Sequence, residues 1–574
     1  MKKEILDFIH MEKLSPFERE RQRNLQSVSA YKTSHARAVH TKLMQKIGNG
    51  FLFDDTHEVF RAFGFTSKKE DIIGRQEFFK SLKKNDFSFL KNIKKNKQKW
   101  NAPYGIIVAT ANENTFISLK NMGCPSKLII SESDINSLEQ YDVVQVIDSD
   151  EYSRFLEQLP NVVFADSIDD VYLERYLMML SEWKDVIEIM RSVDGLPEEL
   201  VEQINDVASM LDMLNNAKKS GINREDIESS LIKINAEISE SLKKMTLSGE
   251  ALIGLMSKGS LPSEISNIIN QAISKSGIPS LIFNKTLPVS IDEEEAGGVL
   301  KKNEATQFTK IVSNLQKNSK KLIGIPEKLE KIERYIIFAD FISGISKYIE
   351  DKMEYPEVSD RVSITYAKNM FIPNAQPVSF WLDDNDKCSI LTGANSGGKT
   401  TLLEHIIQIN SLFQMGLPIE GKVIFPIFSE IYYFAKTKGS ANKGAFETLL
   451  SQMASISSGA NTLILADEIE AVTEPGVAGK IIAATSEYFI KRDCFLVIAT
   501  HLGQEIKPVL PYKARIDGIE AKGLDEKFEL IIDHNPVIGR IAHSTPELIV
   551  EKLAKSRKEE YYRYLHEYIN ANKN

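Results

Sequence analysis

The 574-residue sequence has few cysteines and no long apolar run. Its three cysteines, Cys124, Cys388 and Cys494, are widely spaced, which argues against a disulfide framework or a zinc site and favours small buried apolar side chains. No apolar run approaches the roughly 18 residues that a membrane-spanning helix needs, so we expect no membrane partner. Residues 1–7 are charged and lack the apolar core of a signal peptide. We therefore expect a cytoplasmic protein.

The composition excludes a largely disordered chain and a collagen-like or coiled-coil rod. Apolar residues make up 42% and charged residues 26% of the chain, ordinary values for a folded protein. A length of 574 residues predicts about three to five domains. The net charge of −9 allows nucleic-acid binding where basic residues cluster. Residues 68–100 contain such an excess of lysine and arginine, which fits a nucleic-acid contact and a solvated helical face equally well.

The apolar pattern predicts an α/β protein with a large, mostly helical part. Residues 1–103 are expected to form a basic helical region. Residues 104–167 carry four short apolar runs separated by helix-compatible stretches, which predicts a small parallel α/β domain that serves as a scaffold or interaction unit. Residues 168–355 should form a helical core or lever, residues 356–545 a nucleotide-binding domain, and residues 546–574 a helical tail.

The lever region contains a break at residues 277–295. Prolines and apolar residues on both sides of residues 284–286 predict a β-hairpin there. After residue 301, an apolar stripe at helical spacing predicts an arm that continues to residue 353, with an interruption at Pro326. Two arms with a hairpin between them would form a lever with a tip, or equally a structural spacer.

The decisive motif lies at residues 393–400, which contain G-x-x-x-x-G-K-T. An apolar strand precedes the motif and an apolar-periodic helix follows it, which is the context of a phosphate-binding loop. The glycines let backbone N–H groups point at phosphate oxygens, and the helix N-terminus adds the positive end of its dipole. Lys399 is expected to neutralise the β and γ phosphates, and Thr400 to ligate Mg²⁺. The motif therefore predicts ATP or GTP binding rather than a structural glycine turn.

Two later strand ends predict catalytic side chains. The apolar strand at residues 462–466 is followed by Asp467, suited to a water-mediated Mg²⁺ contact, and by Glu468, suited to polarise the attacking water. A third apolar strand is followed by His501, which would sense the γ phosphate or position the water, or would simply cap the sheet edge. The sequence contains no Asn-Lys-x-Asp motif, so this order of motifs favours an ABC-type ATPase over a GTPase.

These motifs resemble those of the MutS family. Residues 393–401 are similar to that family's G-P-N-x-G-G-K-S/T-T, and residues 371–374 to its F-[IV]-P-N, a segment near the adenine. Residues 467–469 and 499–501 resemble its D-E-I and A-T-H, whereas the ABC signature L-S-G-G-Q is absent. The resemblance is specific over about 360–545 and points to the short archaeal MutS-related branch, which lacks the mismatch-recognition domain.

Three departures from the family pattern stand out. Residues 443–446 occupy the place of the family's S/T-x-F loop, so Phe446 is kept but Gly444 replaces the hydroxyl residue that faces a partner's nucleotide. Residues 470–473 replace the family's G-x-G-T. Neither an N-terminal mismatch-reading domain nor a C-terminal nuclease is expected in this sequence.

The resemblance implies an ABC-type P-loop ATPase domain joined to a helical lever and clamp. Such a protein would bind ATP and Mg²⁺ and clamp double-stranded or branched DNA, rather than mismatched DNA, as a homodimer. Two alternatives stay open: an ATPase that acts on ribosomes or structured RNA, and an SMC-like ATPase, for which the arm is too short. The residues implied for ATP binding are Phe371, Ile372, Gly393, Ala394, Asn395, Ser396, Gly397, Gly398, Lys399, Thr400 and Thr401. The other implied site residues are catalytic Glu468 and His501, the Mg²⁺ ligands Thr400 and Asp467, and Gly444 and Phe446 of the loop that covers a partner's nucleotide.

The hairpin at the lever tip would grip DNA. Its turn contains a lysine, but the four carboxylates of residues 292–295 follow and would repel phosphate, so the flanking lysines should carry the contact, helped by the basic stretch at residues 68–99. Contacts to the phosphate backbone predict sequence-independent, salt-dependent binding. The candidate lysines are Lys285, Lys301, Lys302, Lys310, Lys317, Lys320 and Lys321.

Overall fold

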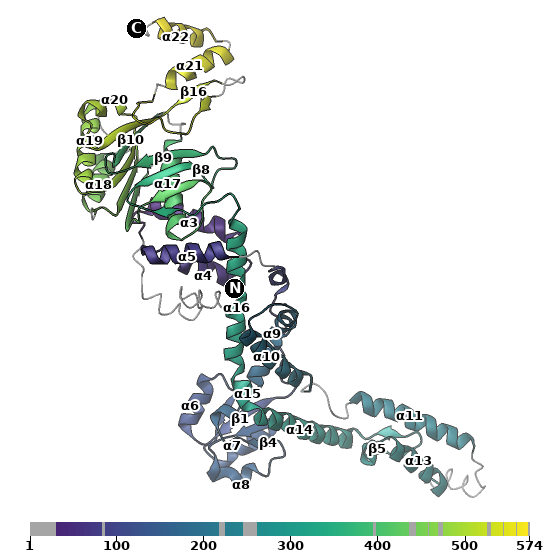
Figure 1. Cartoon of the computed structure of the whole chain (residues 1–574). Coiled ribbons are helices and arrows are strands. Elements are labelled where there is room, and N and C mark those ends of the chain that lie inside the picture. The colour runs from purple at the N-terminus through teal and green to yellow at the C-terminus, as the bar shows by residue number, and fades with distance from the viewer. Residues whose placement is uncertain are drawn as a thin grey trace. The chain divides into compact units, whose positions relative to one another are not determined.

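The computed structural model divides the chain into two units, and both combine parallel strands with helices (Figure 1). The first unit contains residues 1–91 and 334–574, and the second contains residues 92–333. The mixed α/β class predicted from the sequence is confirmed. Among the described residues, no helix is both long enough and apolar enough to cross a membrane. The described residues are 30–82, 87–216, 224–244, 261–393, 398–435, 443–456, 459–468, 475–524, 530–542, 545–557 and 559–571.

A five-stranded parallel sheet of order β12-β13-β14-β10-β15 forms the centre of the first unit. Its strands are β10 (Cys388–Gly393), β12 (Glu430–Phe434), β13 (Thr462–Asp467), β14 (Phe495–Ala499) and β15 (Ala514–Ile519). β13 and β14 are buried along their whole length, which explains their continuous apolar runs. Because β10, β14 and β13 are parallel neighbours, all three end at the same edge of the sheet.

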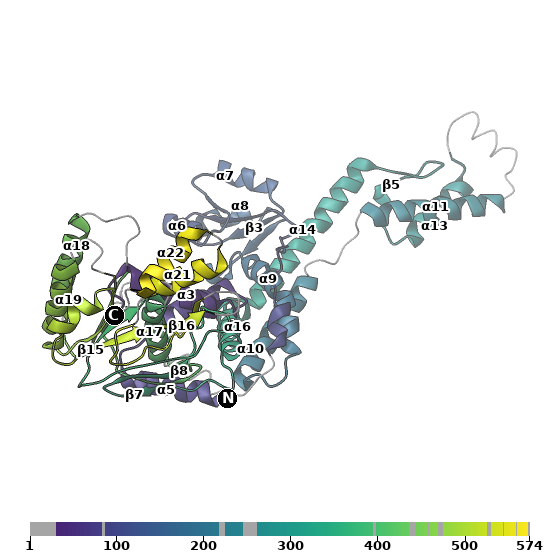
Figure 2. The same cartoon turned by 90° about the horizontal axis from the view of Figure 1, so that it is seen from above.

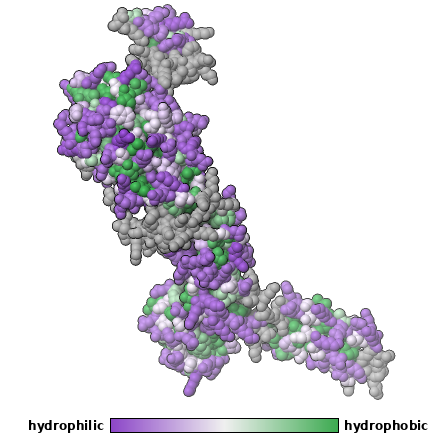
Figure 3. Space-filling model, in the orientation of Figure 1, coloured by the Kyte–Doolittle hydropathy of each residue, from purple (hydrophilic) through white to green (hydrophobic). Residues whose placement is uncertain are grey.

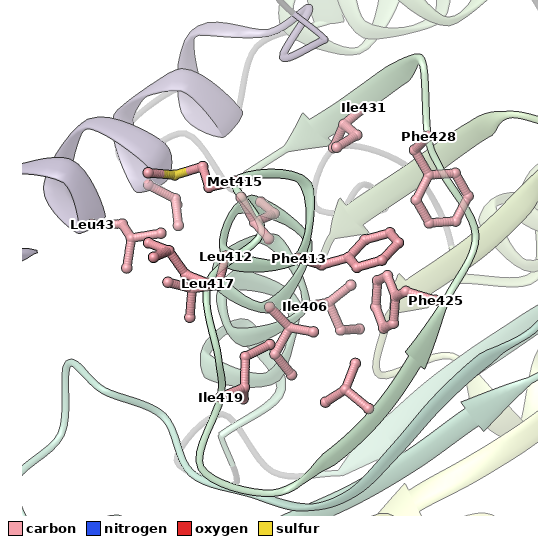
Figure 4. Close-up of a cluster of buried hydrophobic side chains, with 14 of the residues drawn as sticks. Leu43, Ile406, Leu412, Phe413, Met415, Leu417, Ile419, Phe425, Phe428 and Ile431 are labelled. Atoms are coloured by element: carbon pink, nitrogen blue, oxygen red, sulfur yellow. The ribbon is translucent and has the colours of Figure 1, made fainter. Parts of the chain in front are cut away.

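A second sheet of order β7-β11-β8-β9 packs in the same core. Its strands are β7 (Glu357–Val358), β8 (Val362–Ala367), β9 (Val378–Leu382) and β11 (Lys422–Phe425). Helix α17 (Lys399–Gln414) follows the phosphate loop and is buried over most of its length, and its Ile406, Leu412 and Phe413 belong to the apolar cluster drawn in Figure 4. The remaining elements after it are α18 (Lys443–Ala454), α19 (Pro475–Ile490), α20 (Gly503–Ile506), β16 (Ala521–Leu524), β17 (Leu530–Ile532), α21 (Thr545–Ser556) and α22 (Glu560–Ala571).

Three N-terminal helices, α3 (Ser34–Gly48), α4 (Asp54–Phe63) and α5 (Lys69–Ser81), share the core of the first unit. Tyr31 pairs with Ile431 of β12 as a parallel bridge, and its hydroxyl lies 2.6 Å from Ser411 Oγ of α17. The end of the long helix α16 (Ile325–Tyr348) also packs here. A Cβ at its Gly344 would lie 2.2 Å from the Phe51 ring, so this crossing requires glycine. The helices of residues 34–81 are therefore part of the same core as α17.

The second unit contains a small parallel sheet of order β2-β1-β3-β4. Its elements are β1 (Ile106–Thr110), α6 (Glu113–Asn121), β2 (Ser126–Leu128), α7 (Glu132–Asn136), β3 (Val143–Val146), α8 (Ser153–Leu156) and β4 (Val162–Phe164). β2 lies two residues earlier than the apolar run at 128–130 suggests. The reason is a capping box at Ser131, which begins α7 and leaves Ile130 in an exposed connection.

The other helices of the second unit are α9 (Glu174–Arg191), α10 (Glu198–Asn216), α11 (Arg224–Lys243), α13 (Ser263–Lys275), α14 (Glu293–Lys317) and α15 (Ser319–Ile323). α11 and α13 lie side by side in both views (Figures 1 and 2). With the first turns of α14 they enclose a separate apolar cluster rich in isoleucine. The other end of α14 packs on the small sheet, where Val312 contacts Val143 and Val163. One helix thus connects the isoleucine cluster, which we call the tip, to the small α/β domain.

The hairpin at the tip is shorter than expected. Strands β5 (Phe283–Asn284) and β6 (Ser290–Ile291) have two residues each, and residues 280–282 form a 3₁₀ turn. α14 begins at Glu293 rather than after residue 301, because the Asp292 carboxylate caps it by accepting from the N–H groups of Glu294 and Glu295. The acidic residues therefore belong to a helix N-terminus, where the helix dipole favours negative charge.

Candidate nucleotide-binding site

Two glycines shape the described part of the phosphate loop. Gly393 ends β10 at φ +142°, and a Cβ there would lie 2.5 Å from the carbonyl oxygen of Ile519. Gly398 precedes α17 at φ +93°, and a Cβ there would lie 2.9 Å from His534 Nδ1. Both positions therefore require glycine for conformation and for space. The predicted ATP-binding residues Ala394, Asn395, Ser396 and Gly397 lie outside the described residues.

Lys399 and Thr400 form the first turn of α17. Lys399 is almost fully buried and donates to the Gly393 carbonyl oxygen, so its ammonium lies where β10 ends. Thr400 donates from its hydroxyl to Asp467 Oδ2 at 2.6 Å, which joins the start of α17 to the end of β13. The hydroxyl and the carboxylate predicted to hold Mg²⁺ are therefore direct neighbours. Thr401 follows them in the same turn and is half-buried.

Glu468 and His501 lie side by side at the same sheet edge. Glu468 adopts φ +48°, and its N–H donates to the Ala499 carbonyl oxygen of β14 at 2.9 Å. This backbone bend directs the carboxylate toward His501, whose Nε2 lies 2.6 Å from Glu468 Oε1. His501 is thus the neighbour of the proposed base rather than only a cap of the sheet.

A half-buried acidic group that no sequence motif indicated, Glu404, adjoins these residues. Burial raises the pKa of Glu404 on α17, nearby Asp467 raises it further, and the positive charge of Lys42 on α3 lowers it. Burial also raises the pKa of Tyr433 on β12, with Asp467 and Glu404 adding to the effect. These groups come from four elements, so no local motif announces them. The position of Glu404, five residues after Lys399 in the same helix, is the one sequence signal that could have placed it near the loop.

The segment with Phe371 and Ile372 is held on two sides. On one side, Asn369 Oδ1 accepts from the Phe371 N–H at 2.9 Å, and the Lys42 ammonium lies 4.3 Å from the centre of the Phe371 ring. On the other side, Gln376 donates to Asp533 at 2.8 Å. Ile372 is exposed at 44%. The segment therefore contacts both α3 and residues 533–535, which follow β17. His534, one of these residues, lies beside Gly398 of the phosphate loop.

The remaining predicted residues lie elsewhere. Gly444 and Phe446 are in the first turn of α18, where the structure describes only their backbone. Lys285 is exposed in the hairpin turn, and Lys301 and Lys302 lie in α14 with only their backbone described. Exposed lysines also occur further along the chain, Lys310 and Lys317 in the second half of α14 and Lys320 and Lys321 in α15. α14 has 25 residues, so at about 1.5 Å per residue its end lies roughly 38 Å from its start.

The predicted DNA-binding lysines thus form two groups rather than one flank of the hairpin. Lys285 belongs to the tip, and the group at residues 310–321 lies beside the small α/β domain. Figure 3 shows that most of the described surface on this face is hydrophilic, with apolar residues in small groups. Within the described ranges, no cluster of three or more His, Cys, Asp or Glu side chains could hold a metal ion.

Comparison with known proteins places the chain in a family, although no family model matches it. It is 31% identical over 568 residues to the DNA-binding protein MutS2 of Pyrococcus furiosus, a match that covers 92% of this chain and 97% of that protein. It is 26% identical to the endonuclease MutS2 of Borreliella burgdorferi, of which it spans only about half (51%). It is also 26% identical over 207 residues to the DNA mismatch repair protein MutS of Thermotoga maritima, covering 26% of that protein. The resemblance inferred from the motifs is confirmed: the chain belongs to the MutS-related family, as a member of MutS2 type.

Proposed function

We propose that this protein is an ATPase of MutS type that clamps DNA as a homodimer. The observation that carries the proposal is the set of contacts at one sheet edge. Gly393 and Lys399 at the two ends of the phosphate loop, the Thr400–Asp467 pair at 2.6 Å and the Glu468–His501 pair at 2.6 Å come together there from β10, α17, β13 and β14. Three strand ends converge on one place because the strands are parallel, which is where open α/β sheets bind their ligands.

Each residue at this edge has a distinct proposed role. Lys399 compensates phosphate charge, and the segment at residues 371–372 borders the base. A threonine hydroxyl and a carboxylate are ligands that suit Mg²⁺, which fills its other positions with phosphate oxygens and water. When bound, Mg²⁺ supplies charge screening between the β and γ phosphates. Glu468 orients the attacking water, and His501 fixes the Glu468 carboxylate.

ATP turnover by two variants tests this assignment. Lys399→Ala removes the phosphate-compensating charge and should abolish ATP binding. Glu468→Gln keeps the loop and Asp467, so it should retain ATP but hydrolyse it slower by a factor on the order of 10²–10⁴. Glu487→Gln changes an exposed glutamate on α19 and serves as the matched control. Hydrolysis by Glu468→Gln at the wild-type rate would remove Glu468 from the mechanism.

The homodimer part of the proposal rests on the loop at residues 443–446. In a composite site, nucleotide bound to one chain would be covered by this loop of the second chain. With Gly444 in place of a hydroxyl residue, backbone N–H groups would contact the γ phosphate. Phe446→Ala should then weaken ATP-stabilised dimers more than Ala445→Ser does. Sedimentation of the Glu468→Gln variant with ATP checks this, and monomers throughout would refute the composite site.

DNA is the proposed partner because exposed lysines occur in the hairpin turn, in α14 and in α15. None of Lys285, Lys317 and Lys320 has an ion-pair partner among the described residues, so their charge is available to phosphates. Binding to the phosphate backbone should be independent of sequence and should weaken steeply with salt. The name of the relative in Pyrococcus furiosus, a DNA-binding protein, agrees with this choice.

Competition binding at fixed salt tests the DNA proposal and separates the two lysine groups. A four-way junction should bind better than a matched duplex, and a G·T duplex should bind about as well as the matched one. Lys285→Glu tests the tip, the double change Lys320→Glu with Lys321→Glu tests α15, which follows α14, and Lys491→Glu, one residue beyond the end of α19, is the control. A tenfold or greater preference for the G·T duplex would overturn the proposal. Ribosomes that outcompete the junction would identify RNA as the partner instead.

A further inference from the structure

A cavity lies in the first unit, beside α17. Its volume is about 440 Å³, and it is lined by α3, the end of α16, the 368–375 segment and α17. Its lining overlaps the proposed ATP site only in the segment that carries Ile372. Lys399, Asp467 and Glu468 are not part of the lining. The segment of residues 368–376 therefore contacts residues 533–535 on one side and lines this cavity on the other.

Two polar side chains of α17, His405 and Gln408, line the cavity although each is only 1% exposed. The His405 ring bonds to the backbone of Lys368, and burial lowers the pKa of the ring to about 4, so the ring is neutral at physiological pH. Gln408 donates from Nε2 to Asn369 Oδ1 at 3.0 Å. Their other polar atoms, His405 Nε2 and Gln408 Oε1, have no hydrogen-bond partner among the described residues.

These two atoms require hydrogen-bond donors. Gln408 Oε1 is a carbonyl oxygen and can only accept. The N–H of the other ring nitrogen donates a hydrogen bond to the Lys368 carbonyl oxygen. In the neutral ring, His405 Nε2 therefore carries no proton and is also an acceptor. A buried acceptor without a donor costs free energy, so a molecule that brings hydroxyl or amino groups to this wall would be stabilised.

The rim of the cavity carries an excess of positive charge. Four lysines and two glutamates line it. Lys352 and Lys368 both pair with Glu420, at 3.2 and 2.7 Å. Lys46 and Lys347 instead donate to backbone carbonyl oxygens, those of Met370 and Gly50, and have no carboxylate partner in the described part of the chain. Two exposed ammonium groups thus stand at the rim of a cavity whose inner wall holds two unused acceptors.

We propose that this cavity is a second ligand site, separate from the ATP site, for a small phosphorylated molecule of the nucleoside monophosphate class. The phosphate contacts Lys46 and Lys347, and hydroxyl or amino groups of the sugar or base donate to His405 Nε2 and Gln408 Oε1. The cavity volume is in the range of small-molecule sites, roughly 300–1,000 Å³. A ligand here touches α17, whose first turn contains Lys399 and Thr400, and the segment that carries Ile372.

Calorimetric titration of the full chain with AMP, ribose 5-phosphate and inorganic phosphate tests the site. The Lys399→Ala variant serves as the background, because it removes nucleotide binding at the phosphate loop and so separates the two sites. AMP should bind this variant as tightly as it binds the second site of the wild-type protein. Adding Lys347→Glu should weaken AMP binding by about tenfold or more, as expected for a lost charge-assisted hydrogen bond.

Two further variants make the test specific. Gln408→Leu removes the acceptor at nearly constant volume and should also weaken AMP, but not inorganic phosphate. Lys422→Glu, at an exposed position on β11 away from the cavity, should leave AMP binding within twofold. The proposal is overturned if no probe binds the Lys399→Ala protein at millimolar concentration, or if AMP binds equally well after Lys347→Glu. Failure of Glu468→Gln to slow ATP hydrolysis would affect the proposed function alone.

Discussion

The sheet edge of the first unit and the tip of the second unit are built in different ways. At the sheet edge, Lys399 and Asp467 are almost fully buried, and Lys399, Thr400, Asp467, Glu468 and His501 are all held by hydrogen bonds. At the tip, the core is a cluster of seven isoleucines with a few other apolar residues, and Lys285 is exposed in the hairpin turn. The first region depends on individual contacts, whereas the second depends on apolar content and on total charge.

This difference predicts how each region responds to substitution. Buried, hydrogen-bonded groups lose a partner that water cannot replace, so single changes have large effects. Exposed charges act together through a screened field, so single changes have small effects.

Gly393→Ala should have the largest effect. The new Cβ would overlap the Ile519 carbonyl oxygen, at 2.5 Å, and the residue would keep a φ of +142° that alanine disfavours. We expect nucleotide binding to be lost and the first unit to be destabilised by about 3 kcal/mol or more. ATP titration and thermal unfolding check this. Wild-type affinity for ATP would show that the loop tolerates another conformation.

Acid should weaken the first unit in particular. Burial lowers the pKa of His40 and of His405 to about 4, below the usual 6.5. The unfolded chain therefore binds protons that the folded chain does not, and stability falls as pH drops from about 6.5 to about 4, by roughly 3 kcal/mol for each histidine. Hydrogen exchange measured separately for each unit between pH 7 and pH 4.5 checks this. His405→Gln should reduce the pH dependence, and an unchanged slope would exclude His405 as a source.

Glu174 should give the second unit the opposite response. Its carboxylate is fully buried and accepts from the Tyr104 hydroxyl at 2.9 Å, and burial raises its pKa. The folded chain therefore holds a proton that the unfolded chain releases, so this group's contribution to stability decreases as pH rises above the usual value near 4.5. Glu174→Gln keeps an acceptor for Tyr104 without the charge, so it should stabilise the second unit at pH 7. Denaturant unfolding at pH 5 and pH 7 measures the effect, and destabilisation at both would contradict it.

Gly298→Ala should have the smallest effect and serves as the counterpart of Gly393→Ala. Nothing lies within 4 Å of a Cβ at Gly298, which is in the first turns of α14. Alanine restricts the unfolded chain and favours helix, so we expect a gain of about 0.5–1 kcal/mol. Thermal unfolding monitored for the second unit checks the sign. A loss of stability would mean that this part of α14 contacts another molecule when the protein assembles.

Local pattern was sufficient to predict several features from the sequence. The continuous apolar runs before Asp467 and His501 predicted buried strands, because a strand covered on both faces needs apolar residues at every position. The glycines at 393 and 398 predicted the tight phosphate loop, because only glycine adopts those backbone angles without strain. Such features depend on residues adjacent in the chain, so the order of residues determines them.

Only the tertiary structure decided which distant residues meet. Neither the contact between Thr400 and Asp467 nor the approach of Glu404 to Asp467 could be measured in the sequence, since α17 and β13 are separate elements. The start of α14 was misjudged because the cap at Asp292 acts together with Arg224, which pairs with Glu293 at 2.6 Å from another helix. The packing of the helices of residues 34–81 in the core with α17, and the cavity beside α17, also depend on contacts between residues that are far apart in the sequence. Periodicity records which face of an element is apolar, but packing of whole elements determines what that face contacts.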